Sequence, residues 1–248
     1  MNIELTTALN GKIKIWQPVN GYRFAIDSIL MAAFVPNKCV NILELGVGVG
    51  AASLALAHRL PNAHITGIDI QDDNIELAKK NVQNNAFSDR FSLILDDFRN
   101  RKLPGHYFDC IMMNPPFHEE DNYLPSPSPH KTTSHGENKT TLQHWMDEAY
   151  RCLKSHGNIV IVHKSDRLDD LLTFLHVKYG QIEVFPLWPK EGRAAKRVLI
   201  RAQKASKAAT KLYPGLIIHQ PNGDYTSEAK KILEGGMGII TVNEMVGS

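Results

Sequence analysis

The chain has 248 residues, with 28 basic and 26 acidic side chains, 43 % apolar residues and 22 % charged residues. This composition excludes a disordered chain, a collagen-like repeat and a coiled coil, and the length suits one large domain, 1–248. No apolar run approaches the roughly 20 residues of a membrane-spanning helix, and the first residues do not resemble a signal peptide. Because Cys39, Cys110 and Cys152 are far apart, we expect neither a disulfide framework nor a cysteine-based metal site, and a cytoplasmic location.

Short β-rich runs alternate with helical patterns from residue 41 onward. In chain order we expect a strand at 41–45, a helix at 51–59, a strand at 64–68, a helix at 72–84, strands at 91–95 and 108–113, a helix at 142–153, a strand at 158–163, a helix at 168–178, strands at 181–185 and 197–202, and a short helix at 227–233. The series predicts an α/β fold with a mostly parallel sheet, helices on both faces and an antiparallel hairpin at the end.

Two stretches stand outside this alternation. Residues 118–141 hold three prolines and three histidines and are too long for an ordinary connection, so they form either a functional flap or a disordered insertion. Residues 211–248 form a C-terminal tail. The histidines in and near the first stretch match no zinc-binding spacing, so we predict no metal; they are His118, His130, His135 and His144.

A glycine-rich turn joins the first strand of the series to its helix, with glycines at Gly46, Gly48 and Gly50 after Glu44. Glycines there allow a tight turn and close approach of a ligand, and the helix N-terminus favours negative charge. Asp69, followed by Ile70, ends the next strand, where a carboxylate can accept hydrogen bonds from a ribose. The pattern predicts an adenosine-containing cofactor, either a nicotinamide dinucleotide or S-adenosylmethionine. The alternative is a glycine-rich turn that binds nothing.

Asp96, Asp97 and Phe98 follow the third strand. One carboxylate could hold the adenine amino group while Phe98 packs against the ring, and we assign that carboxylate to Asp97. The alternative is a solvated pair of acids at a strand end.

The sequence Asn114-Pro115-Pro116-Phe117 directly follows the fourth strand. Two prolines make a stiff turn, so the carbonyl groups of Asn114 and Pro115 can point into a cleft. The Asn114 side chain adds an acceptor and donors, and Phe117 offers a ring for stacking on a planar group. A nicotinamide enzyme has no need of this arrangement, although it could also be a plain strand-ending turn.

At these residues the sequence resembles the amino-methyltransferases that use S-adenosylmethionine. Further stretches at 21–30, 167–171, 197–201 and 224–226 are similar to the bacterial tRNA(Val) adenine-N6-methyltransferase family. The resemblance runs from about residue 9 to residue 233. The 118–141 stretch departs from the family's shorter region after the catalytic motif.

The resemblance implies a Rossmann-like sheet of seven strands and methyl transfer to the N6 amine of an adenine in RNA, in a tRNA anticodon loop. It makes Asn114, Pro115, Pro116 and Phe117 the catalytic residues, with Asn114 also near the cofactor. It also implies that the segment 1–40 covers the methionine end of the cofactor through Tyr22, Phe24 and Asp27. Alternatively, Tyr22 and Phe24 are core aromatics and Asp27 is a helix N-cap.

Basic residues concentrate between Trp188 and Lys211, where eight cations face one acid, and the rest of the chain carries a charge of −5. Such asymmetry indicates contact with a polyanion, or else a solvated face. We expect Lys190, Arg193, Lys196 and Arg197 to grip RNA phosphates.

Other functions stay open at this stage. A protein glutamine methyltransferase would need a helical substrate domain, for which the roughly 40 residues before Gly46 leave little room. A DNA adenine methyltransferase would need a target-recognition domain, and an rRNA enzyme of the same class is a further alternative. The remaining alternatives are a nicotinamide oxidoreductase and a non-catalytic RNA-binding module. The oligomeric state is undetermined.

Overall fold

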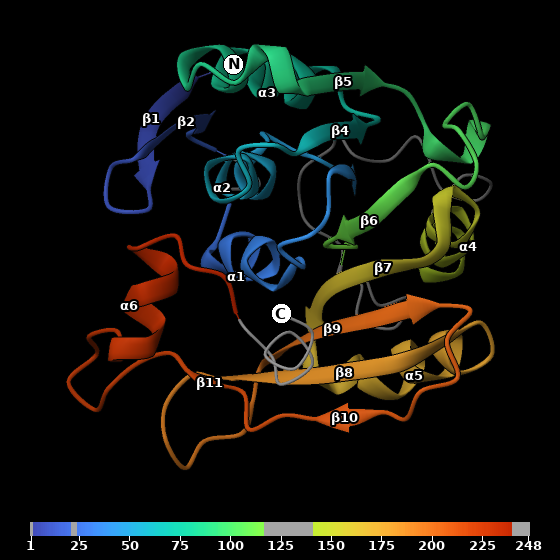
Figure 1. Cartoon of the computed structure of the whole chain (residues 1–248). Coiled ribbons are helices and arrows are strands. Elements are labelled where there is room, and N and C mark those ends of the chain that lie inside the picture. Colours follow the sequence, from blue (N-terminus) through green and yellow to red (C-terminus); the bar gives the residue numbers. More distant parts are fainter. Residues whose placement is uncertain (1, 21–23, 117–140, 240–248) are drawn as a thin grey trace, which may run out of the picture.

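The computed structural model describes residues 2–20, 24–116 and 141–239. Its main sheet runs in the order β10-β8-β9-β7-β6-β3-β4-β5, with β11 also paired to β8 (Figure 1). All neighbours are parallel except β9, which is antiparallel to both β7 and β8. The strands are β3 (Asn41–Leu45), β4 (His64–Asp69), β5 (Phe91–Leu95), β6 (Phe108–Met113), β7 (Leu153–Lys164), β8 (Tyr179–Trp188), β9 (Arg197–Lys204), β10 (Lys211–Leu212) and β11 (Leu216–Ile217).

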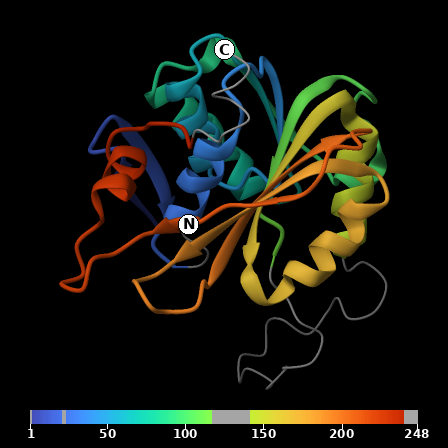
Figure 2. The ribbon, with the colours of Figure 1, turned by 60° about the horizontal axis from the view of Figure 1, so that its bottom comes forward.

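Helices cover both faces of this sheet (Figure 2). One face packs against α1 (Ile26–Phe34), α2 (Ala51–Arg59) and α3 (Asp72–Asn84), with α6 (Ser227–Leu233) lying against α1. The other face packs against α4 (Leu142–Cys152) and α5 (Leu168–His176). Strands buried on both faces need apolar residues at nearly every position, which explains why β6 is apolar except for Asp109. The α/β fold with its antiparallel end is confirmed.

An N-terminal hairpin lies outside the main sheet and was not expected from the sequence. It joins β1 (Ile3–Ala8) to β2 (Ile13–Pro18), and side-chain amides of α3 hold it in place. The Asn81 amide accepts from Trp16 N (2.7 Å) and donates to the Trp16 and Val49 carbonyls (2.9 Å each). Asn85 makes a similar pair of bonds with the backbone of Lys14. One asparagine thus gives β2 the two backbone hydrogen bonds that a neighbouring strand would supply.

The structure divides the basic segment into two kinds of cation. Arg201 is buried, pairs with buried Glu183 and also donates to the Phe34 carbonyl (3.1 Å). Lys204 is buried as well and donates to the carbonyls of Tyr150 (2.6 Å) and Leu153 (2.7 Å). These two residues lie in β9, which is covered on both faces, so they stabilise the fold instead of facing a polyanion.

The described residues also bear on the expectations about a membrane span, a metal site and residues 118–141. Within the described ranges, no helix has the length and apolar character required to cross a bilayer. Nor does this part of the chain bring three or more metal-ligating side chains together. His144 caps the start of α4 through a bond from Thr141 N to its Nδ1 (3.1 Å). Nearly all of the 118–141 stretch lies outside the described residues.

Candidate active site at the carboxyl edge of the sheet

Four neighbouring strands end at the same edge and bring together the segments that the sequence singled out. Leu45 of β3 pairs with Ile68 of β4 and with Met113 of β6, and Asp69 pairs with Leu95 of β5. At this edge β3 is therefore followed by Gly46, β5 by Asp96 and β6 by Asn114, and β4 ends with Asp69 and is followed by Ile70. Because adjacent strands are about 4.8 Å apart, the row spans roughly 14 Å. Ligands of open α/β sheets bind at this edge.

The glycine-rich turn has a left-handed backbone at all three glycines, with φ of +69° at Gly46, +54° at Gly48 and +86° at Gly50. A Cβ at Gly46 would lie 2.6 Å from the Trp145 ring, whereas one at Gly48 would meet nothing within 4 Å. Gly46 is thus required by packing, and Gly48 leaves open space above the turn. Such space lets a ligand approach the backbone.

The Asp69 carboxylate is held firmly beside this turn. One oxygen accepts from Gly48 N (2.8 Å), and the other accepts from Gln71 N (2.9 Å) and the Asn74 side chain (3.3 Å). A carboxylate has about four acceptor positions, so capacity remains for a ribose hydroxyl. The adjacent Ile70 side chain is 62 % exposed and offers an apolar surface for a flat ring.

Glu44 lies beneath the turn and is buried. Its carboxyl accepts a hydrogen bond from the Ser53 hydroxyl of α2. Burial raises the pKa of Glu44 to about 8, and the negative charge of Asp69 acts in the same direction. The hydrogen bond between Glu44 and Ser53 joins β3 to α2 under the glycine-rich turn.

Asp96 and Asp97 have different partners. The Arg99 guanidinium binds both oxygens of Asp97 and, with the Arg99 backbone N–H, keeps the pKa of Asp97 below its ordinary value. Asp96 accepts from Lys102 (2.8 Å) and Asn100 (2.6 Å), which lower its pKa. Both carboxylates are therefore charged and anchored at the end of β5.

The sequence reasoning missed Trp145, which lies at the centre of this edge. Its ring meets Phe98 edge-on, with centroids 4.9 Å apart, and covers Gly46. The side chain is buried, and its Nε1 has no hydrogen-bond partner in the described part of the chain. A buried donor without a partner is costly, and an acceptor atom on a bound ligand would satisfy it. The sequence signal was an aromatic residue early in α4, far from the other motifs.

Of the other residues predicted to form the site, the structure describes Asn114, Pro115, Pro116 and Phe24. Asn114 is half-buried directly after β6, Pro115 is buried and Pro116 is exposed. Phe117 and Tyr22 lie outside the described residues. Phe24 is half-buried against the core that includes α1.

Asp27 is not the N-cap of α1, because Ala25 occupies that position. The Asp27 carboxylate, in the first turn of α1, instead accepts from Arg197 Nε (2.9 Å). Arg197 is therefore engaged with α1, and it is half-buried. Lys190, Arg193 and Lys196 are exposed in the loop between β8 and β9, which lies at the same edge as Asn114.

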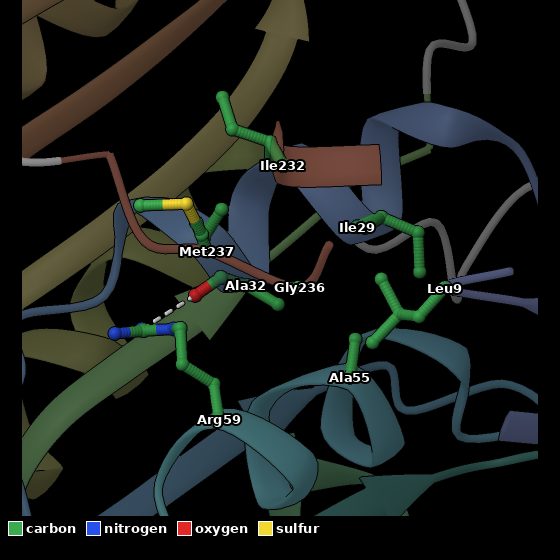
Figure 3. Close-up of a pocket in the computed structure, with 9 residues that line it drawn as sticks. Leu9, Ile29, Ala32, Ala55, Arg59, Ile232, Gly236 and Met237 are labelled. Carbon is green, nitrogen blue, oxygen red and sulfur yellow. Dashed lines mark hydrogen bonds between the residues drawn. The ribbon is translucent and has the colours of Figure 1, made fainter. Parts of the chain in front are cut away.

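A small hollow between α1, α2 and α6 is lined mostly by apolar side chains (Figure 3). Its volume is about 10 Å³, close to that of a single water site. Arg59 lies at its border and donates to the Ala32 carbonyl (2.8 Å), which caps the end of α1. The carboxyl edge is therefore the candidate active site.

The fold and this edge together define a class of enzyme. A nicotinamide-binding Rossmann sheet is parallel in the order 3-2-1-4-5-6, whereas here antiparallel β9 is inserted between β7 and β8. The glycine-rich turn, the fixed Asp69 and the buried donor of Trp145 fit an adenosine-containing cofactor. These features are those of the S-adenosylmethionine-dependent methyltransferases.

Comparison with known proteins agrees with this class. The chain belongs to the methyltransferase small domain family, whose model matches residues 25–185. A tRNA1(Val) (adenine(37)-N6)-methyltransferase of Porphyromonas gingivalis is 30 % identical, over 86 % of this chain and 87 % of the relative. Relatives with the same name occur in Pedobacter heparinus (26 % identity, 86 % and 89 % covered) and Vibrio campbellii (28 % identity, 82 % and 84 % covered).

Solved structures share the fold. A predicted O-methyltransferase of Agrobacterium tumefaciens has a TM-score of 0.73 at 23 % identity, covering 88 % of this chain and 99 % of that chain. TYW2 of M. jannaschii in complex with AdoMet has a TM-score of 0.54 at 17 % identity, covering 77 % and 81 %.

Proposed function

We propose that this chain transfers a methyl group from S-adenosylmethionine to the N6 amine of adenine 37 in a tRNA1(Val), a nucleotide of the anticodon loop. The names of its relatives support this, since they match it over most of both chains. The observation that carries the proposal is the register of Leu45 with Met113. It puts Asn114 and Pro115 directly beside the glycine-rich turn.

The cofactor residues have separate roles in this proposal. Bound S-adenosylmethionine supplies an electrophilic methyl group on a sulfonium. Asp69 accepts from the ribose hydroxyls, and Asp97 accepts from the adenine amine. Ile70 and Phe98 contact the adenine ring. The turn at Gly46, Gly48 and Gly50 lies along the cofactor, and Glu44 supports this turn from below. Tyr22, Phe24 and Asp27 cover the methionine end of the cofactor.

The target amine is positioned by the turn after β6. Its two N–H groups donate to the Asn114 side-chain oxygen and the Pro115 carbonyl, which turns the nitrogen lone pair toward the methyl group. Phe117 stacks on the target base, and Pro116 stiffens the turn. Such alignment is worth several kcal/mol of the barrier. No strong base is required, because the nitrogen that has received the methyl group is acidic while it is still protonated.

The RNA approaches from the loop between β8 and β9. Lys190, Arg193 and Lys196 contact phosphates there, and Arg197 adds charge while it holds Asp27. The target base leaves its stack to reach Asn114, which costs least in a single-stranded loop. A tRNA substrate also implies a cytoplasmic enzyme.

The proposal is tested with methyl-labelled S-adenosylmethionine and total tRNA from a strain that lacks this activity, with the label mapped by nucleoside mass spectrometry. We expect N6-methyladenosine in one valine tRNA. Asn114→Ala should abolish it, whereas Asn84→Ala, an exposed position of α3, should not. Cofactor binding without label in any RNA would contradict the proposal and favour a protein acceptor, such as a glutamine side chain.

A further inference from the structure

A second hollow opens at the end of β8, on the same edge as Asn114 but three strands away. Its apolar lining comes from Trp188, Pro214 and Ile217, and its charged lining includes Lys190 and Arg193. At about 4.8 Å per strand, the hollow lies roughly 14 Å from the turn after β6. It is therefore outside the cofactor site.

The walls of this hollow are built by specific contacts. Trp188 Nε1 donates to the Pro214 carbonyl (2.9 Å), and Ile218 N donates to the Trp188 carbonyl (2.8 Å). Gly215 makes the corner with φ of +83°, and a Cβ there would lie 2.1 Å from the Pro186 carbonyl oxygen. The C-terminal segment is thus fixed along the end of β8, with the indole held at the inner wall.

The charge of the hollow is predominantly positive. Lys190 and Arg193 are exposed, and Lys190 Nζ is directed toward the C-terminal segment by a bond to the Pro221 carbonyl (3.1 Å). Glu191 adds one acid to the lining. The loop at 189–196 carries three cations against the one acid, so it attracts an anion.

We propose that the hollow receives one unpaired nucleotide of the RNA substrate, a near neighbour of the methylated adenine. The base packs against Trp188 and the adjoining apolar wall, and its phosphate is bound by Lys190 and Arg193. An aromatic platform beside two cations is how proteins hold single-stranded nucleic acid. The inference rests on the proposed function, and it adds a second point of contact that orients the loop.

The first test uses an anticodon stem-loop oligoribonucleotide of tRNA1(Val), with binding measured by fluorescence anisotropy and methylation measured at several salt concentrations. The double variant Lys190→Ala/Arg193→Ala should bind about 10-fold more weakly. The slope of log affinity against log salt should fall by about 2. The affinity for S-adenosylmethionine, measured without RNA, should stay as in the wild type, since both residues lie outside the cofactor site.

Lys207→Ala is the matched control. Lys207 belongs to the same basic segment and is exposed, but it follows the end of β9 at the opposite edge of the sheet. It should leave the RNA affinity unchanged. If the double variant behaves like Lys207→Ala while methylation is intact, this inference is overturned together with the phosphate contacts of Lys190 and Arg193, and the proposed methyl transfer stands. If the wild type methylates no RNA, the proposed function falls, and this inference falls with it.

A second measurement tests the base contact. The adenine analogue 2-aminopurine replaces each loop nucleotide beside the target in turn, and stacking quenches its fluorescence. One position should be quenched on binding to the wild type and to Trp188→Phe, but not to Trp188→Leu. Quenching of no position in the wild type, or equal quenching in both variants, would overturn the base contact.

Discussion

Glu44 is a buried acid, 4 % exposed, and the glycine-rich turn lies directly above it. The Ser53 hydroxyl is its hydrogen-bond partner, and burial is the main cause of its pKa of about 8. At neutral pH the carboxyl is therefore mostly protonated in the folded protein without cofactor. In the unfolded chain its pKa returns to the ordinary value near 4.5.

This difference predicts a pH-dependent stability. Between pH 4.5 and about 8 the folded state keeps a proton that the unfolded state has lost, so the free energy of unfolding falls as pH rises through this range. The contribution is at most about 1.4 kcal/mol per pH unit. Glu44→Gln removes it and keeps an acceptor for Ser53. Urea unfolding at pH 5.5 and 7.5, without cofactor, should show the variant gaining roughly 2 kcal/mol over the wild type between the two pH values. If the free energy of unfolding depends on pH in the same way in both proteins, the raised pKa of Glu44 is contradicted.

The neighbouring carboxylates Asp96 and Asp97 give a second prediction at this scale. We expect Asp97→Ala to weaken S-adenosylmethionine binding by 10-fold or more, because a hydrogen bond to a charged group is worth about 1.5–3 kcal/mol. Asp96→Ala should have a smaller effect, because in the proposed function the adenine amine donates to Asp97 and not to Asp96. Isothermal titration calorimetry on the two variants measures both affinities, and the reverse order would assign the adenine contact to Asp96.

At the scale of the elements, the N-terminal hairpin is attached to the end of α3 by the side chains of Asn81 and Asn85. Asn81 is fully buried and makes three hydrogen bonds to the backbone of Trp16 and Val49. Its removal leaves buried backbone groups without partners, each costing about 1–3 kcal/mol. Asn81 thus joins β2, α3 and the glycine-rich turn.

We expect Asn81→Ala to lower the free energy of unfolding by roughly 3 kcal/mol. Asn84→Ala, an exposed asparagine on the same helix, should change it by less than about 0.5 kcal/mol. Urea denaturation followed by circular dichroism compares the two. Equal stabilities would show that the hydrogen bonds of Asn81 do not stabilise the attachment of the hairpin.

At the scale of the whole molecule, binding of S-adenosylmethionine should raise the free energy of unfolding. A ligand that binds only the folded state at about 100 times its Kd adds about 2.7 kcal/mol. For a chain of this size we expect Tm to rise by about 5–10 °C with S-adenosylmethionine. Differential scanning calorimetry should show no such shift for Asp69→Ala, whose carboxylate is fixed beside Gly48. A full shift in that variant would remove Asp69 from the cofactor site.

The sequence predicted the main sheet well because its signals are local. The bounds of α2, α3, β5 and β6 agree with the expected ranges, since apolar periodicity and turn residues mark both ends. The hairpin at β1 and β2 was missed because its anchor, Asn81, is 65 positions from Trp16. Trp145 was missed for the same reason, since only the fold brings it to Gly46.

The basic segment shows another limit of sequence reasoning. In a strand buried on one face, alternate residues reveal which side chains face solvent, but β9 is covered on both faces. The residue pattern predicts a strand at 197–202 and leaves Lys190 and Arg193 in the loop before it, but nothing in the order of residues shows that Arg201 and Lys204 are buried. Their partners come from distant elements, as Phe34 does for Arg201 and Tyr150 does for Lys204.

The position of β9 between β7 and β8 has a consequence for synthesis on the ribosome. β8 is made before β9, yet its place in the sheet depends on β9 as its neighbour. Until residue 204 has left the exit tunnel, the nascent chain presents an open edge on β7 and a β8 segment without a place to pair. Exposed strand edges favour aggregation. We therefore expect the interval of translation from β7 to β9 to expose the chain to aggregation until β9 has joined the sheet.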